Sequence, residues 1–230
     1  VAAAAQVKVA ERADDFRLVD HKSKTQLLSY YKNSPAVVII SQQNGAKAIR
    51  DAAAEIKALQ ASFASKEVPL LLLNSNPADN RDTIAAEMAS LGLDVPVLLD
   101  DTQLVGEGLG VSRVAQAIVI QPKTWKVVYS GPISAGSKTY VADAVNSLVA
   151  GTPVKVSMAE IKTPLIAFPN RDAKASHANI SYEKDISPIL AKNCVACHSE
   201  GGIGPFPMNS YEIVKQFSGA TANPYDDIVV

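Results

Sequence analysis

Apolar and polar residues form two kinds of pattern from the start of the chain to Gly151. Short apolar runs predict strands that are covered on both faces of a sheet, and they occupy residues 36–41, 68–74 and 96–99. Between the first two runs, apolar side chains recur at three- and four-residue spacing, which predicts a helix over residues 47–66. A second helix is expected to start at Asp79 or Asn80 and to end at Gly92.

A β-hairpin and a last helix complete this region. Residues 117–120 and 126–129 are β-prone runs joined by a short stretch that contains Pro122, which predicts an antiparallel hairpin. An amphipathic helix with apolar side chains from Tyr140 to Leu148 follows. The order of elements predicts an α/β fold in which an antiparallel pair of strands extends a parallel core.

The run from Val37 to Leu59 resembles the first strand and active-site helix of thioredoxin-like envelope oxidoreductases and peroxiredoxins. Those proteins place a reactive cysteine at the amino terminus of this helix, where the helix dipole lowers the pKa of a thiol. The corresponding residues 44–50 contain no cysteine, and alignment puts Ala115 where the family carries a cis-proline. The resemblance implies a thioredoxin-like domain over residues 15–151 that lacks a CxxC motif and is redox-inactive.

Four charged residues could lie near the position that a reactive cysteine occupies in thioredoxin-like proteins. With no thiolate to support, Arg50, Arg113 and the pair Asp100 and Asp101 are expected to be solvated or salt-bridged structural residues. Residues 22–24 are expected to form a polar turn.

The strongest chemical signal is Cys194-Val195-Ala196-Cys197-His198, which spells C-x-x-C-H, the attachment motif of a c-type haem. Cys194 and Cys197 are the only two cysteines of the chain. Their thiols can add to the haem vinyl groups, and His198 then binds the iron as the proximal ligand. A free redox dithiol, half of a zinc site and a chance occurrence are the alternatives. The adjacent histidine favours one covalently bound haem c.

Residues 180–190 resemble the amino-terminal helix of small cytochrome c domains, which carries this motif at its carboxyl end. In class I cytochromes c, a glycine-proline loop follows, and its proline carbonyl accepts a hydrogen bond from the axial histidine. The resemblance assigns that role to Pro205. Met208 is the candidate sixth ligand of the iron, with packing in the loop as the alternative interpretation. His177 would give a bis-histidine site instead, with a place in the linker and no contact with the iron as the favoured alternative.

The chain as a whole resembles bacterial envelope proteins that fuse a redoxin domain to a c-type cytochrome domain. We expect an extension over residues 1–14, a linker over residues 152–179 and a short, mainly α cytochrome segment over residues 180–230. Within the linker, residues 154–156 could instead form a last irregular strand of the first domain. Residues 180–230 are too few to cover both faces of a haem. We therefore expect either that the chain is cut short or that a partner completes the haem pocket.

Composition limits the partners. The formal net charge of −1 and pI of about 6.3 give no polyanion-binding surface, so nucleic acid is not expected as a partner. No apolar run is long enough for a transmembrane segment. The small-residue start, residues 1–6, is typical of a mature end after signal cleavage. Together with the haem motif, it predicts a periplasmic or otherwise exported protein.

Three functions follow as hypotheses. The first is electron transfer to or from a redox partner protein or a larger oxidoreductase complex, with the redoxin domain as a docking or scaffold module and no substrate chemistry of its own. The second is a structural or assembly subunit of a larger haem-containing complex. The third is a thiol oxidoreductase that uses Cys194 and Cys197 as a free dithiol.

Overall fold

The chain divides into two compact units. A computed structural model describes residues 9–169 and 180–217. The first unit spans Val1–Pro169 and the second spans Asn170–Val230. None of the helices in the described ranges is long and apolar enough to cross a lipid bilayer.

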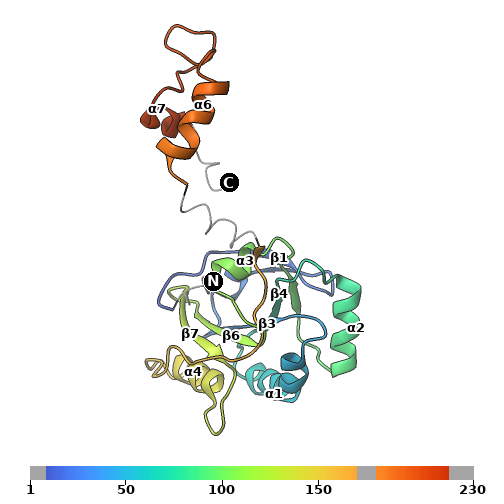
Figure 1. Cartoon of the computed structure of the whole chain (residues 1–230). Helices are drawn as coiled ribbons and strands as arrows, with labels where there is room; N and C mark the ends of the chain where they lie inside the picture. Colours follow the sequence, from blue (N-terminus) through green and yellow to red (C-terminus); the bar gives the residue numbers. More distant parts are fainter. Residues whose placement is uncertain (1–8, 170–179, 218–230) are drawn as a thin grey trace. The chain divides into compact units, whose positions relative to one another are not determined.

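A five-stranded sheet forms the centre of the first unit (Figure 1). Its strand order is β5-β4-β3-β6-β7, with bounds β3 (Val37–Gln42), β4 (Leu70–Asn74), β5 (Val97–Leu99), β6 (Gln116–Gln121) and β7 (Lys126–Pro132). Strands β3, β4 and β5 are parallel, whereas β6 runs antiparallel to both β3 and β7. The predicted parallel core with an antiparallel extension is confirmed.

Over residues 9–168, the helices beside the sheet are α1 (Lys47–Ala64), α2 (Arg81–Leu91), α3 (Leu104–Gly108) and α4 (Tyr140–Val149). Helix α2 begins as predicted, because the Asn80 side chain accepts hydrogen bonds from the amides of Asp82 and Thr83. It also ends as predicted, at Gly92 in the left-handed conformation that glycine adopts at low energetic cost.

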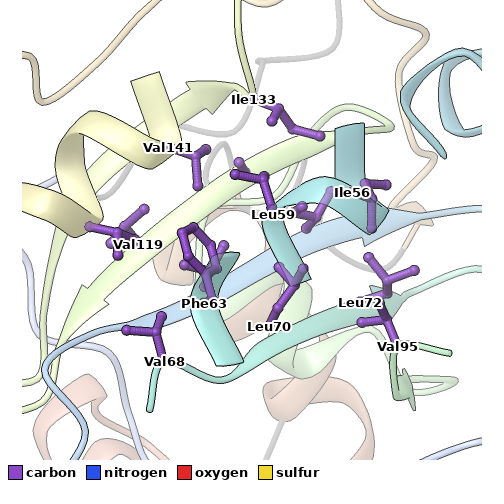
Figure 2. Close-up of a cluster of buried hydrophobic side chains, with 14 of the residues drawn as sticks. Ile56, Leu59, Phe63, Val68, Leu70, Leu72, Val95, Val119, Ile133 and Val141 are labelled. Atoms are coloured by element: carbon purple, nitrogen blue, oxygen red, sulfur yellow. The ribbon is translucent and has the colours of Figure 1, made fainter. Parts of the chain in front are cut away.

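Alternate strand residues serve two hydrophobic cores, one on each face of the sheet. In β3, Val38 and Ile40 point into the core covered by α1, α2 and α4, while Val37 and Ile39 point into the opposite core. Figure 2 shows the first core, where Phe63 of α1 packs beside side chains of the strands and of α4. Phe63 is fully buried, and removing such a side chain from water contributes about 1.5–3 kcal/mol.

The opposite core is closed by short elements that the apolar pattern did not predict. Strands β1 (Arg17–Val19) and β2 (Thr25–Leu27) form an antiparallel hairpin, followed by the 3-10 turn η1 (Leu28–Tyr31). The hairpin contains the predicted polar turn, because the Asp20 carboxylate accepts hydrogen bonds from the amides of Lys22 and Lys24. These strands are too short for a two-residue period to be recognised.

Both ends of the first unit differ from the expected boundaries. Residues 9–14 are not an extension, since the amide of Val127 in β7 donates to the carbonyl of Glu11 at 3.0 Å and Ala13 is buried. Residues 152–169, expected as the first part of a linker, belong to the compact first unit.

The final segment of the first unit, residues 157–168, is called the strap here. Its beginning pairs with β7 through a parallel bridge from Met158 to Ser130, rather than through residues 154–156. Further along, the amide of Ile166 donates to the carbonyl of Ser112 at 2.9 Å. Ile166 and Phe168 are buried in the second core. Apolar side chains therefore hold the strap on the domain.

In the second unit, residues 180–217 form the π-helical turn η2 (Tyr182–Ile186) and the short helices α6 (Ser187–Asn193) and α7 (Tyr211–Phe217). Pro188 lies in the first turn of α6, where a proline needs no amide hydrogen for the helix. The rings of Tyr182 and Tyr211 meet edge to face, with centroids 5.1 Å apart, and so connect η2 with α7.

Candidate functional site

The loop between β3 and α1 lies where thioredoxin-like enzymes carry their reactive thiol. Two carboxylates from outside the loop bind its main chain. The Asp79 carboxylate accepts a hydrogen bond from the amide of Asn44 at 3.0 Å, and Glu87 of α2 accepts one from the amide of Gly45 at 2.7 Å. These two amides are therefore already occupied by acceptors within the same unit.

A network of buried amide side chains supports the same loop. The Asn74 side-chain nitrogen, at the end of β4, donates to Gln42 at 2.6 Å and to Asp79 at 2.8 Å. Gln42, the last residue of β3, in turn donates to the Asn44 side chain at 2.8 Å. These amide and carboxylate groups pair with one another, so the arrangement fixes the loop.

Ala115 lies beside the first turns of α1, as the alignment predicted. It lines a groove of about 450 Å³ together with Ala48 and Ala52 of α1 and with Thr163 and Pro164 of the strap. Its backbone has a positive φ of 57°, and its amide donates to the carbonyl of Ser41 at 2.9 Å. No peptide bond among the described residues is cis.

The charged residues near the pocket have structural partners. The Arg50 guanidinium donates to the carbonyl of Gly45 at 2.6 Å, and that of Arg113 donates to the carbonyl of Thr163 in the strap. The prediction for Asp100 was wrong, because its side chain is neither solvated nor salt-bridged but fully buried. Asp101 is exposed, and its carboxylate accepts a hydrogen bond from the amide of Thr102.

Asp100 organises the start of α3 from the inside. Its carboxylate accepts hydrogen bonds from the Ser75 hydroxyl at 2.7 Å and from the amides of Gly106 at 2.8 Å and Val105 at 3.2 Å. Burial raises the pKa of Asp100 above its ordinary value, although these donated hydrogen bonds oppose the shift. A carboxylate so completely enclosed has no access to a substrate.

The C-x-x-C-H motif follows α6 in the second unit. Two hydrogen bonds to the carbonyl of Cys194, from the amide of Cys197 at 3.1 Å and from that of His198 at 2.9 Å, fold the motif into a tight turn. Both thiols are free; Cys197 is exposed and Cys194 is partly exposed. The turn thus presents two accessible thiols next to one imidazole.

The imidazole of His198 is held by a main-chain carbonyl. Its Nδ1 atom lies 2.9 Å from the carbonyl oxygen of Phe206. Because a carbonyl only accepts, Nδ1 carries the proton, and Nε2 of the neutral ring keeps the lone pair that can bind a metal. The acceptor is therefore Phe206 and not Pro205, one residue earlier, which corrects the carbonyl assigned from the cytochrome resemblance.

Two further residues, Met208 and His177, were candidate ligands of the haem iron. Met208 lies on the loop that returns to the motif, with its amide donating to the carbonyl of His198 at 2.8 Å. His177 lies outside the described residues. Over residues 9–169 and 180–217, no group of three or more His, Cys, Asp and Glu side chains is arranged to hold a metal ion, which gives a zinc site no support.

Sequence comparison connects the first unit to one family. Residues 9–135, more than half of the chain, match the AhpC/TSA family. The matched range includes the loop between β3 and α1, and it ends before the strap and the C-x-x-C-H motif. No curated protein matches this chain.

Solved structures show the same fold. A hypothetical protein from Sinorhizobium meliloti 1021 is 20% identical, with a TM-score of 0.64, over 70% of this chain and 94% of that one. An uncharacterized conserved protein from Geobacillus kaustophilus is 21% identical, with a TM-score of 0.64, over 71% and 93%. Peroxidoxin BcpB from Mycobacterium tuberculosis is 20% identical, with a TM-score of 0.51, over 64% and 98%. At these identities, the likeness establishes a thioredoxin-like fold.

Proposed function

The chain belongs to the AhpC/TSA family, and we propose that it is an electron-transfer protein whose redox centre is a haem c attached at Cys194, Cys197 and His198. The family domain then acts as a docking or scaffold module, and a redox partner protein or a larger oxidoreductase complex exchanges electrons with the haem. The observation that carries this proposal is the contact between His198 and Phe206 next to two free thiols.

The residues around the motif fit this group. Cys194 and Cys197 are both free for thioether bonds, and the Nδ1–H group of His198 is engaged by the Phe206 carbonyl, so Nε2 is available to bind iron. Haem iron supplies one-electron oxidation and reduction. The chain's own part is to hold the imidazole in one tautomer and orientation.

Exposed apolar side chains in the second unit also support a large apolar ligand. Residues 180–215 contain no fully buried side chain. Ile189 is 56% exposed and Ile203 is 91% exposed. Burying apolar surface is the main favourable contribution to folding, and a unit of this size has little core of its own. A haem would supply apolar surface for such side chains to cover.

The thiol-free first unit supports the division of roles. AhpC/TSA proteins that act on thiols need a cysteine, and residues 1–193 contain none. The amides of Asn44 and Gly45 bind Asp79 and Glu87 instead of a thiolate. We therefore assign this domain no redox chemistry. Because c-type haem is generally attached outside the bacterial cytoplasmic membrane, the proposal also implies a periplasmic or otherwise exported location.

A structural or assembly subunit of a larger haem-containing complex is the second candidate. The groove of about 450 Å³ between α1 and the strap favours it, because a recess of this kind can receive another chain. In that case the haem would not exchange electrons with soluble mediators. The two candidates therefore differ in one measurable property, reversible reduction of the attached haem.

The test is expression of the full chain in a bacterium that attaches haem in its periplasm. We expect sharp α and β absorption bands after reduction, which persist after extraction with acidified acetone, and reversible reduction by small mediators. Cys194→Ser and Cys197→Ser should each weaken attachment, whereas Ser199→Ala, next to the motif, should leave it unchanged. Complete extraction of the colour would reject covalent haem. Attached haem that no mediator reduces would favour the assembly role.

A further inference from the structure

The loop after the motif is folded back onto His198 by main-chain hydrogen bonds. The amide of Gly204 donates to the carbonyl of Cys197 at 2.7 Å, and the amide of Met208 donates to the carbonyl of His198 at 2.8 Å. Between these two bonds, the carbonyl of Phe206 reaches Nδ1 of His198 at 2.9 Å. Placement of this carbonyl therefore depends on how closely the loop approaches the imidazole.

Gly204 sets this approach. A Cβ atom added at Gly204 would lie 2.6 Å from Nδ1 and 2.7 Å from Cγ of His198, and 2.9 Å from the carbonyl oxygen of Cys197. Each of these separations is shorter than a non-bonded contact of carbon with nitrogen, carbon or oxygen. The ring atoms concerned lie at the base of the imidazole, and the third atom belongs to the main chain. Neither can yield without moving the ring or opening the loop.

We propose that Gly204 is a positioning residue for His198: the missing side chain lets the loop close onto the imidazole, so that the Phe206 carbonyl holds the Nδ1–H tautomer and leaves Nε2 for the iron. This inference rests on the proposed haem function for its consequence at the metal. The tautomer itself is a property of the chain without haem.

The neighbouring residues offer two matched controls. A Cβ at Gly202 would lie 2.5 Å from the carbonyl oxygen of Cys197 and 2.9 Å from the Ser199 hydroxyl, so Gly202→Ala strains the same loop, and its three nearest contacts include no imidazole atom. Ile203, between the two glycines, is 91% exposed, so Ile203→Ala should disturb neither the loop nor the ring.

The first measurement uses the full chain without haem, labelled with 15N at its three histidines. A His198→Gln variant identifies the His198 signals. At neutral pH we expect the wild-type chain, Gly202→Ala and Ile203→Ala to show His198 mainly as the Nδ1–H tautomer. Gly204→Ala should show a mixture of both tautomers. An unchanged tautomer in Gly204→Ala would overturn the proposal, as would a loss of the same size in Gly202→Ala.

The second measurement uses the full chain with haem attached. The Nδ1–H hydrogen bond places electron density on the ligating nitrogen, which favours ferric iron. We therefore expect Gly204→Ala to raise the midpoint potential above the wild-type value, and both control variants to keep it. Equal potentials in Gly204→Ala and Ile203→Ala would overturn the proposed consequence at the metal. If the wild-type chain attaches no haem, the proposed function fails, while the tautomer measurement still decides the role of Gly204.

Discussion

His21 and the main chain of Val97 exchange two hydrogen bonds, one through the imidazole and one through the His21 amide. The amide of Val97 donates to Nδ1 of His21 at 3.1 Å, and the amide of His21 donates to the carbonyl of Val97 at 2.9 Å. A buried side chain thus holds β5 at the edge of the central sheet. Sequence reasoning did not single out His21 for this role, since no local pattern marks its partner 76 residues away.

This pair predicts a loss of stability in mild acid. Burial, reinforced by the nearby Lys22 charge, lowers the pKa of His21 below its ordinary value of 6.5. The unfolded chain therefore binds a proton here before the folded chain does. Neutral His21 therefore contributes its full stabilisation of the fold above about pH 6.5. This contribution is lost as the pH falls toward the lowered pKa of His21 in the folded state. Chemical denaturation from about pH 7 to about pH 5 should show a falling free energy of unfolding.

His21→Asn is the control for that pH dependence. The asparagine oxygen can accept the amide of Val97 but does not titrate in this range. The variant should therefore show a weaker decrease in stability with acidification than the wild-type chain. Parallel curves for the two proteins would show that another group is responsible.

Two glycines of α3 predict opposite effects of the same substitution. A Cβ at Gly106 would overlap the Ser75 hydroxyl and approach the Asp100 carboxylate and the Phe168 ring at 3.2 Å each. Gly106→Ala should destabilise the chain by about 1–3 kcal/mol, because the buried cluster that anchors α3 must shift. A Cβ at Gly108 would meet no other part of the protein within 4 Å, so Gly108→Ala should be neutral or stabilise by up to about 1 kcal/mol. Urea denaturation compares them, and equal effects would contradict this packing.

Removing the Asp79 carboxylate should loosen the loop that precedes α1. Asp79→Ala leaves the amide of Asn44 and one hydrogen of the Asn74 side chain without their acceptor, at a cost of about 1–3 kcal/mol. Hydrogen exchange of the Asn44 amide should accelerate. Asp51→Ala removes only an exposed ion pair with Lys47 and should change stability by less than about 1 kcal/mol. Unchanged exchange in Asp79→Ala would show that the loop is held by other contacts.

Met208→Ala tests the candidate sixth ligand in the haem-loaded chain. If His198 binds the iron as proposed, Met208 is poorly placed to supply the second ligand, because its amide is hydrogen-bonded to the carbonyl of His198 itself. We therefore expect the absorption spectrum and the midpoint potential to stay unchanged. A shifted spectrum after this substitution would instead identify the Met208 sulfur as the ligand.

Much of the fold could be predicted because its signals are local. The continuous apolar runs of β3 and β4, the apolar stripe of α1 and the caps of α2 each depend on residues near one another in the chain. The short hairpin β1-β2 and helix α3 lack such a signal. The strap was assigned to a linker because Pro164, with Pro153 and Pro169 on either side of the strap, interrupts the apolar pattern. Ile166 and Phe168 nevertheless bury the strap in the second core.

The sequence by itself determined the alternating α/β core, the absence of a thiol from the AhpC/TSA domain and the adjacency of two thiols and an imidazole in Cys194–His198. These properties depend on residue identity and short spacing. Only the tertiary structure decided which groups meet. Asp79 and Glu87 bind main-chain amides that lie 35 and 42 residues away in the sequence. His198 is held by the carbonyl of Phe206 and not by that of Pro205. Such hydrogen bonds depend on backbone dihedrals and on the packing of distant segments, and one-residue changes in a loop redirect a carbonyl.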